Sequence, residues 1–254
     1  MELDGRVVVV TGGTRGVGAG IARSFLEAGA EVVVCARRPP REPVAADGRT
    51  ASFTALDLRD PAAVEEFFGA LEQRYGRLDC LVNNAGGTPY RLLGEGGAER
   101  HARVVELNLL APMTASLAAY PRLRESRGSV VMIGSVSGTR PSPGTAAYGA
   151  AKAGLENLAR SMAVEWAPEV RVNSLVLGMV RTELAHLHYG DEAGIDAVAA
   201  TVPLGRLADP SDVGAAAVFL ASGRAGYVSG ASLLVHGGGE RPAFLDAATV
   251  NKES

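Results

Sequence analysis

Hydrophobic residues along the chain follow two alternating patterns. Short runs rich in Val, Leu and Ile are typical of strands that are buried on both faces of a parallel sheet. We expect such strands at residues 6–10, 31–35, 51–56, 78–82, 129–133, 170–175 and 232–235. Most of the longer segments between them carry apolar residues at helical spacing. We expect helices at residues 19–28, 61–75, 98–124, 146–166 and 211–221.

The alternation of strands and helices predicts the fold class. It is an α/β fold: a Rossmann-like doubly wound parallel sheet of about seven strands, with helices on both faces. No linker or internal repeat interrupts the pattern, so we expect one domain over residues 1–254, with its ligand at the carboxyl ends of the strands. The tail, residues 240–254, carries no readable pattern beyond its polar end. In a strand order of 3-2-1-4-5-6-7, Cys35 and Cys80 would lie about 9–10 Å apart, too far for a disulfide.

Individual residues predict where some elements begin and end. Asp60 is expected to cap a helix whose first turn holds Pro61. Three prolines within residues 38–43 predict a loop, because proline is not accommodated inside a helix. The helix at 98–124 is apolar on most sides, which indicates either a subunit interface or an inner helix covered by the rest of the chain.

Composition and charge exclude several classes of protein. The chain has 47% hydrophobic and 21% charged residues, and its net charge of -3 gives no electrostatic case for nucleic acid or an anionic membrane as partner. No apolar run approaches the roughly 20 residues that span a bilayer. The first five residues lack the basic and apolar regions of a signal peptide. Cys35 and Cys80 lie in apolar runs typical of buried thiols, so we expect a cytoplasmic location.

Residues 11–18, Thr-Gly-Gly-Thr-Arg-Gly-Val-Gly, carry the first candidate chemistry. They lie between a predicted strand and a predicted helix, where glycines allow the backbone to approach a pyrophosphate at the positive end of the helix. The spacing is G-x-x-x-G-x-G rather than the more widespread G-x-G-x-x-G. A structural turn is the alternative for this stretch taken alone.

Tyr148 and Lys152 form the second candidate site. They lie four residues apart in a predicted helix and therefore share one face. A phenol has a pKa near about 10, and a nearby ammonium group lowers this pKa toward the range useful for proton transfer. Ser135, at the end of the fifth strand, points to the same end of the sheet. Small residues around Tyr148 would let a helix or a ligand approach closely, whereas a solvated helix face is the alternative.

These motifs and two others follow one another at characteristic separations. The others are Asn83-Asn84-Ala85-Gly86, after the fourth strand, and Asn108. In this combination, residues 4–239 resemble the short-chain dehydrogenase/reductase family in its one-domain form. The resemblance implies an NAD(P)-dependent oxidoreductase that interconverts a secondary alcohol and a ketone by hydride transfer. The alternative is a catalytically silent sensor or scaffold that binds the dinucleotide; epimerase or dehydratase relatives are usually longer.

The resemblance also implies a role for each matching residue. Tyr148 would be the catalytic acid and base, Lys152 would lower its pKa and bind the nicotinamide ribose, and Ser135 would hold the substrate oxygen. Asn108 would support a water-linked proton relay, with a local cap or kink before Pro112 as the alternative. The implied cofactor-binding residues are Gly12, Thr14, Arg15, Gly16, Val17, Gly18, Arg37, Asp57, Leu58, Asn84, Ala85, Gly86, Tyr148, Lys152, Val180 and Thr182. The family usually has Pro-Gly after the sixth strand, and this chain has Leu177-Gly178, so the turn under the nicotinamide is expected to differ.

Residues 183–202 stand in the position of the family's substrate-covering lid. His186 and His188, with nearby carboxylates, could be read as a metal site, but the chemistry needs no metal and a matched third ligand is lacking, so no metal is expected. The few polar residues around the presumed pocket predict a bulky apolar substrate, such as an alicyclic or steroid-like ketone or a fatty acyl chain.

Arginine residues predict the choice of cofactor. Relatives that use NAD place an acidic residue at the end of the second strand, where this chain has Ala36 followed by Arg37, and Arg15 lies in the glycine loop. A guanidinium group can bind a 2′-phosphate, so we expect NADP(H) to be favoured over NAD(H), with solvated surface arginines as the alternative. The apolar helices at 98–124 and 146–166 predict a homodimer or homotetramer.

Overall fold

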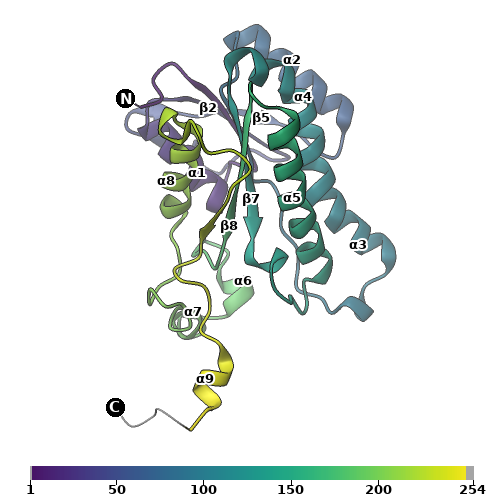
Figure 1. The fold of residues 1–254 in the computed structure, drawn as a ribbon, viewed down its shortest axis with the longest axis vertical. Helices are drawn as coiled ribbons and strands as arrows, with labels where there is room; N and C mark the ends of the chain where they lie inside the picture. Colours follow the sequence, from purple (N-terminus) through teal and green to yellow (C-terminus); the bar gives the residue numbers. More distant parts are fainter. Residues whose placement is uncertain (1, 250–254) are drawn as a thin grey trace.

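A seven-stranded parallel sheet forms the centre of the computed structural model, which describes residues 2–249 (Figure 1). Its strands follow the order β5-β2-β1-β6-β7-β8-β9. Their bounds are β1 (Val7–Thr11), β2 (Glu31–Ala36), β5 (Ser52–Ala55), β6 (Cys80–Asn83), β7 (Ser129–Ser135), β8 (Arg171–Leu177) and β9 (Ser232–Val235). The predicted fold class and the order 3-2-1-4-5-6-7 are both confirmed.

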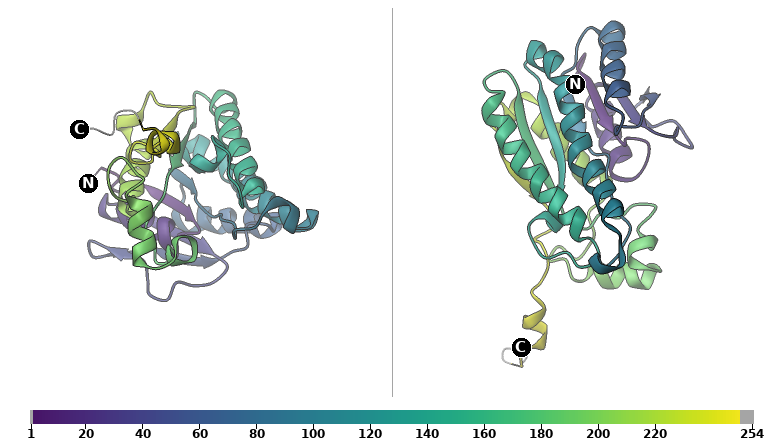
Figure 2. Two further views of the ribbon diagram at one scale, coloured as in Figure 1. Left: turned by 90° about the horizontal axis from the view of Figure 1, so that it is seen from below. Right: turned by 90° about the vertical axis from the view of Figure 1, so that its right-hand side faces the viewer.

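Helices cover both faces of this sheet (Figures 1 and 2). Helices α1 (Gly16–Glu27) and α8 (Pro210–Ala221) lie on one face. The other face carries α2 (Pro61–Tyr75), α4 (Ala111–Ser126) and α5 (Ala146–Glu165). Successive residues of β1 alternate between the two hydrophobic cores, so the strand needs apolar residues at every position.

Local signals set several element ends as predicted. The Asp60 carboxylate accepts hydrogen bonds from the N–H groups of Ala62 and Ala63 at 3.1 and 3.2 Å and so caps α2. The proline-rich segment is a loop, as expected. A short antiparallel hairpin after it was not predicted: β3 (Ala45–Ala46) and β4 (Arg49–Thr50) are joined by Asp47-Gly48, both at positive φ.

The predicted helix at 98–124 is three segments instead of one. A π-helical turn, η2 (Glu106–Leu110), separates α3 (Ala98–Val105) from α4. The inner side of α4 is buried against the sheet, whereas Leu110 and Leu117 are 44% and 60% exposed. The helix is therefore covered on one side only within a single copy of the chain.

Short helices gather beyond the carboxyl ends of the strands, at the lower end of the molecule in Figure 1. Helices α6 (His186–Tyr189) and α7 (Glu192–Ala199) have a small core of their own, which consists of Ala185, Ile195, Val202 and Leu207 and is called the lid cluster below. Helix α9 (Ala243–Ala247) projects away from the body (Figures 1 and 2). The last five residues of the predicted tail, 250–254, lie outside the described residues. The remaining short helices are η1 (Leu93–Glu95), η3 (Val136–Gly138) and η4 (Gly223–Ala225).

The two cysteines are free and buried. Cys35 lies on β2 and Cys80 on β6, and β1 separates the two strands. Burial raises the pKa of each thiol to about 12. Within residues 2–249, no helix is both long and apolar enough to cross a membrane.

Candidate active site

The glycine loop between β1 and α1 has space for backbone only. A Cβ atom at Gly12, where φ is +63°, would lie 2.9 Å from the Cα atom of Ala85. A Cβ atom at Gly18 would lie 2.3 Å from the Gly12 carbonyl oxygen. Glycine is therefore required at both positions, which leaves the backbone of the loop accessible to a ligand. Of the other predicted residues of the loop, Arg15 is exposed, while Thr14 and Val17 are half-buried.

The amino end of α1 already binds a negatively charged group. The N–H of Gly16 donates a hydrogen bond to Oε1 of Glu183 at 3.0 Å, although 167 residues separate the two in the sequence. Free N–H groups and the helix dipole make such an end a favourable place for an anion. The carboxylate of Glu183 stands in for a phosphate oxygen, so the loop fits the pyrophosphate of a dinucleotide.

Thr11 joins the glycine loop to the segment after β6. Its buried Oγ1 accepts hydrogen bonds from the N–H groups of Asn84 and Ala85 at 2.9 and 3.0 Å, and it donates to the carbonyl oxygen of Val82. The side chain of Asn84 donates to the Thr11 carbonyl oxygen at 2.9 Å. Thr11 was not predicted as a site residue, but a hydroxyl at a buried strand end must find partners, and that was the available signal.

Asn108 lies fully buried in the π-helical turn. Its Nδ2 donates to the carbonyl oxygens of Val104 and Gly87 at 2.9 and 3.0 Å, and its Oδ1 accepts from the N–H of Gly87 at 2.9 Å. A Cβ atom at Gly86 would lie 2.5 Å from this Oδ1. The buried amide of Asn108 is thus hydrogen-bonded at both its nitrogen and its oxygen. The π turn around it is a local irregularity of the helix before Pro112, of a kind that often occurs at functional sites. Asn108 fixes the loop after β6, and its role in a proton relay stays a prediction.

Tyr148, Lys152 and Ser135 come together at the carboxyl end of the sheet. Burial raises the pKa of Tyr148, and its side-chain hydrogen bond with Ser135 opposes this rise. The buried Nζ of Lys152 lies 5.5 Å from the centre of the Tyr148 ring and donates to the carbonyl oxygen of Ile133 at 2.7 Å. Burial lowers the pKa of Lys152 to about 8. The expected effect of Lys152 on the pKa of Tyr148 stays a prediction.

Small residues allow the strand end and α5 to approach each other closely, as expected. A Cβ atom at Gly149 would lie 2.6 Å from the carbonyl oxygen of Ser137. One at Gly138 would lie 2.8 Å from the N atom of Ala153. Larger side chains would push η3 away from α5, so these glycines set the distance between Ser135 and Tyr148.

Asp57 and Leu58, which the resemblance to the family implies beside the adenine of the cofactor, have a neighbouring cation that the sequence analysis missed. Arg59 binds the carboxylate of Asp57 through two hydrogen bonds of 2.6 and 2.9 Å. Arg59, and more weakly Arg37, lower the pKa of Asp57 to about 2. Arg37 is exposed but lies within electrostatic range of Asp57. The side chain of Leu58 is buried in the core, so any contact it makes with adenine comes from its backbone.

Comparison with known proteins decides the family. Residues 12–240 match the family model described as enoyl-(acyl carrier protein) reductase. The chain belongs to the short-chain dehydrogenase/reductase family. It is 40% identical over 244 residues to L-fucose dehydrogenase of Oryctolagus cuniculus, which covers 93% of this chain and 85% of that one. It is 36% identical over 242 residues to the 3-oxoacyl-(acyl-carrier-protein) reductase FabG of Vibrio cholerae, which covers 94% and 98%.

A solved structure of the family resembles the whole fold. The RhlG/NADP active-site complex of Pseudomonas aeruginosa superposes with a TM-score of 0.85 at 31% identity, over 93% of this chain and 97% of that one. These relatives show that the chain is an NAD(P)-dependent oxidoreductase of the short-chain dehydrogenase/reductase family, and that its chemistry interconverts alcohols and ketones.

Leu177-Gly178 stands at the end of β8, where the family usually has Pro-Gly. Strand β8 continues through Leu177, which pairs with Val235, and the N–H of Gly178 then donates to the Val235 carbonyl oxygen at 3.0 Å. Leucine retains the N–H group and the free φ that proline lacks, so the ladder can extend by a residue. Beyond this turn, Val180 forms a β-bridge with Ala208.

Thr182 lies beside the glycine loop of this family member. Its Cγ2 is 3.5 Å from the position that a Cβ atom would take at Gly16. The predicted lid, residues 183–202, begins directly after it, and His186 and His188 lie exposed on α6. In the part of the chain that the structure describes, no group of three or more His, Cys, Asp or Glu side chains is arranged to hold a metal ion.

Proposed function

We propose that the chain is a single-domain, NADP(H)-preferring oxidoreductase that interconverts a secondary alcohol and a ketone, with Tyr148 as acid and base. One observation carries the proposal. Tyr148 is hydrogen-bonded with Ser135 above the buried Lys152, at the same sheet edge where the amino end of α1 binds a carboxylate.

Each residue of the site has its own role in the proposed reaction. A bound nicotinamide supplies or accepts the hydride. Ser135 holds the substrate oxygen, and Tyr148 gives this oxygen a proton during reduction and removes one during oxidation. A phenol with a raised pKa is suited to the acid role, and the positive charge of Lys152 favours the phenolate that forms after the proton has left. Asn108 keeps the loop after β6 in place beside the cofactor.

The preference for NADP(H) rests on charge. Ala36 ends β2 at the position where an NAD enzyme would carry a carboxylate, Arg37 follows it, and Arg15 lies at the start of α1. The nearby carboxylate of Asp57 is paired with Arg59, which reduces its repulsion of a 2′-phosphate. The similar RhlG structure was solved as an NADP complex, which supports the same choice here.

A turnover assay tests the proposal against the alternative of a silent sensor. Purified protein is mixed with NADPH or NADH and a panel of ketones, and the loss of the reduced cofactor is followed by absorbance. We expect consumption of NADPH that depends on both protein and ketone. Binding of NADPH without turnover of any ketone would favour the sensor, and faster turnover with NADH would contradict the cofactor preference.

Three further properties stay predictions. A homodimer or homotetramer is supported by exposed apolar side chains on α4 and α5, such as Leu117 and Val164. The cytoplasmic location rests on sequence composition alone. The bulky apolar substrate is a prediction that an assay with alicyclic and acyl ketones would test.

A further inference from the structure

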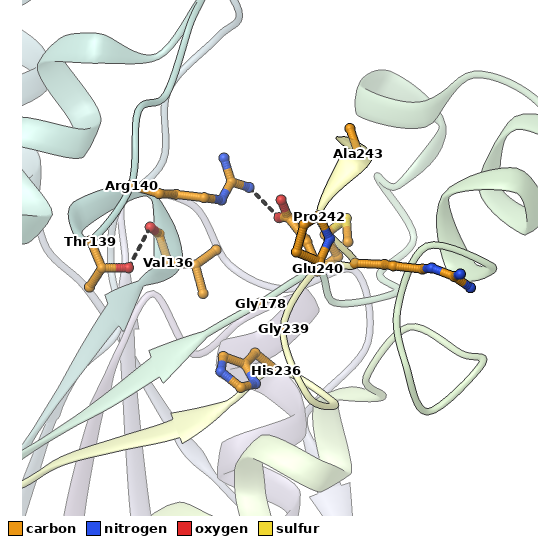
Figure 3. A pocket seen from close by; sticks show the side chains of 11 residues that line it. Val136, Thr139, Arg140, Gly178, His236, Gly239, Glu240, Pro242 and Ala243 are labelled. Carbon is orange, nitrogen blue, oxygen red and sulfur yellow. Dashed lines mark hydrogen bonds and ion pairs between the residues drawn. The ribbon is translucent and has the colours of Figure 1, made fainter. Parts of the chain in front are cut away.

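A cavity of about 390 Å³ lies between the segment after β7, Gly178 at the end of β8, and residues 236–243 (Figure 3). One of its lining residues is Val136, which directly follows the predicted catalytic Ser135 in the chain. The volume lies within the roughly 300–1,000 Å³ that is usual for small-molecule sites. Its position next to Ser135 makes it a continuation of the place where a substrate oxygen would bind.

Charged side chains line the outer part of this cavity. Arg140 lies on one side and Glu240 on the other, while the ring of His236 lies toward the sheet (Figure 3). Arg241 also belongs to the lining. A guanidinium group and a carboxylate lose solvation when an apolar group covers them. The lining therefore argues against the wholly apolar substrate predicted from the sequence.

An ion pair bridges the two sides of the cavity. Nη2 of Arg140 donates a hydrogen bond to Oε1 of Glu240, exactly 100 residues later in the sequence. The two side chains are 43% and 39% exposed. Ion pairs this exposed contribute little to the stability of the fold. A ligand can therefore replace one partner of the pair at a small cost in free energy.

The backbone holds Glu240 in place over the cavity. Gly237, Gly238 and Gly239 have φ values of 64°, 97° and 90°, a conformation that turns the chain back after β9 and that side chains rarely allow. The N–H of Leu204 donates to the Gly237 carbonyl oxygen at 3.0 Å, which ties this turn to the segment that follows the predicted lid. The lid residue Tyr189 lies within electrostatic range of both Glu240 and Arg140. The ion pair thus lies where the segment after β7, the turn after β9 and the predicted lid come together.

We propose that Arg140 and Glu240 are specificity-determining residues that select a polyhydroxylated substrate of about the size of a sugar. The proposal rests on the proposed function, because it places the reacting carbon of the same substrate at Ser135 and Tyr148. A carboxylate accepts hydrogen bonds from hydroxyl groups, and the planar guanidinium group donates to hydroxyl oxygens. Neighbouring hydroxyls of one molecule can satisfy both groups at once. The 40% identity to an L-fucose dehydrogenase agrees with this substrate class.

The test compares a sugar with an alcohol that has a single hydroxyl. NADP+ is combined with L-fucose, D-glucose or cyclohexanol, and kcat/KM is measured for each in the unmodified protein, in Glu240→Gln and in Arg140→Gln. We expect the ratio of kcat/KM for the best sugar to that for cyclohexanol to fall at least about ten-fold in each variant, mainly through KM for the sugar. Melting temperatures are measured to show that the variants fold.

Glu72→Gln is the matched control. Glu72 pairs with Arg122 at 2.7 Å, is half-exposed, and joins α2 to α4 away from the cavity. We expect this variant to leave the sugar-to-cyclohexanol ratio unchanged, so a fall specific to the cavity pair supports the proposal.

Other outcomes would overturn the proposal. One is that the unmodified protein oxidises cyclohexanol with NADP+, or reduces the acyl mimic ethyl acetoacetate with NADPH, and turns over neither sugar. Another is that the ratio in both cavity variants equals that of the control. In these cases Arg140 and Glu240 do not select for hydroxyl groups, while the proposed function stands. If NADP(H) neither binds nor reacts with any of these compounds, the proposed function itself fails, and this inference fails with it.

Discussion

At the scale of single residues, the phenol of Tyr148 experiences two opposing effects. Burial raises its pKa, and the hydrogen bond with Ser135 lowers it. If its proton is the one transferred, Tyr148→Phe should reduce kcat by at least about 100-fold and leave the dissociation constant of NADPH within about two-fold, since only proton transfer is lost. Initial-rate assays measure kcat, and fluorescence titration measures the dissociation constant of NADPH. Tyr227→Phe, at a fully exposed tyrosine, is the control, and near-normal turnover by Tyr148→Phe would show that another group is the acid.

Lys152 connects the active site to stability. Burial lowers its pKa from 10.5 to about 8, so between these two pH values the unfolded chain keeps a proton that the native protein has lost. The free energy of unfolding should therefore rise with pH across this window, by up to about 3 kcal/mol, whereas below pH 8 the penalty of the buried charge is fully present.

Urea denaturation of the cofactor-free protein and of Lys152→Met checks this at several pH values from 7.5 to 10.5. The difference between the two proteins isolates the lysine, because both retain the two cysteines, whose pKa is about 12 in the native protein and 9.0 in the unfolded chain. The free energy of unfolding of the unmodified protein should increase relative to that of Lys152→Met as the pH rises. A constant difference would mean that Lys152 keeps its ordinary pKa in the native state.

Arg37 should decide between the two dinucleotides. Losing a charged contact to a phosphate costs about 1.5–3 kcal/mol, so Arg37→Asp should weaken NADPH binding roughly 10- to 150-fold and shift the preference toward NADH. Fluorescence titration with both reduced cofactors measures the change. Arg41→Asp in the following loop controls for net charge. Tighter binding of NADH than of NADPH by the unmodified protein would show that Arg37 and Arg15 are ordinary surface residues.

At the scale of elements, the contact between the lid and α1 has a measurable effect. The carboxylate of Glu183 accepts a hydrogen bond from the N–H of Gly16, at the position expected for the pyrophosphate of a bound dinucleotide. A carboxylate there competes with the phosphate and repels it, so Glu183→Gln should tighten NADPH binding by about two- to five-fold. Isothermal titration calorimetry measures this, with Asp196→Asn on α7 as the control for a lid carboxylate. Weaker binding in Glu183→Gln would mean that this carboxylate assists the cofactor.

The main elements could be predicted because their signals are local. Val7 to Val10 form a continuous apolar run, and Asp60 with Pro61 marks a helix start, so neither requires knowledge of the rest of the chain. The glycine loop and the Tyr148–Lys152 pair were likewise readable from spacing within one element. Such signals predicted the strands and the main helices, whereas most of the candidate site residues were implied by the resemblance to the family.

The missed features depend on contacts between distant segments. The π turn forms around Asn108, whose partner Gly87 lies 21 residues earlier, and no helical spacing encodes that contact. The contact of Glu183 with Gly16 spans 167 residues. Hairpin β3–β4 was missed for another reason, because strands of two residues are too short to show an alternating pattern.

At the scale of the whole molecule, large apolar side chains remain exposed on two pairs of elements. On α4 and α5, which are called the first patch below, Leu117 and Val164 are 60% and 80% exposed. On α8 and the edge strand β9, called the second patch, Phe219 and Leu234 are exposed. Association through two different surfaces of this kind would build a tetramer from two dimers.

Light scattering at micromolar concentration should therefore give the mass of two or four chains. Leu117→Glu should lower this mass, because a carboxylate in the first patch would be desolvated on association. Glu165→Gln, at a charged surface position, should not lower it. A monomeric mass for the unmodified protein would show that these patches do not associate with one another.

The lid cluster has a consequence for how such a protein changes over generations. Its four residues bury one another, and none of them belongs to the two cores that flank the sheet. Mutations in this segment can therefore accumulate without unpacking the part of the molecule that carries Arg37 and the glycine loop. A change of substrate could therefore be made within the predicted lid, residues 183–202, while the sheet keeps the packing that forms the cofactor site.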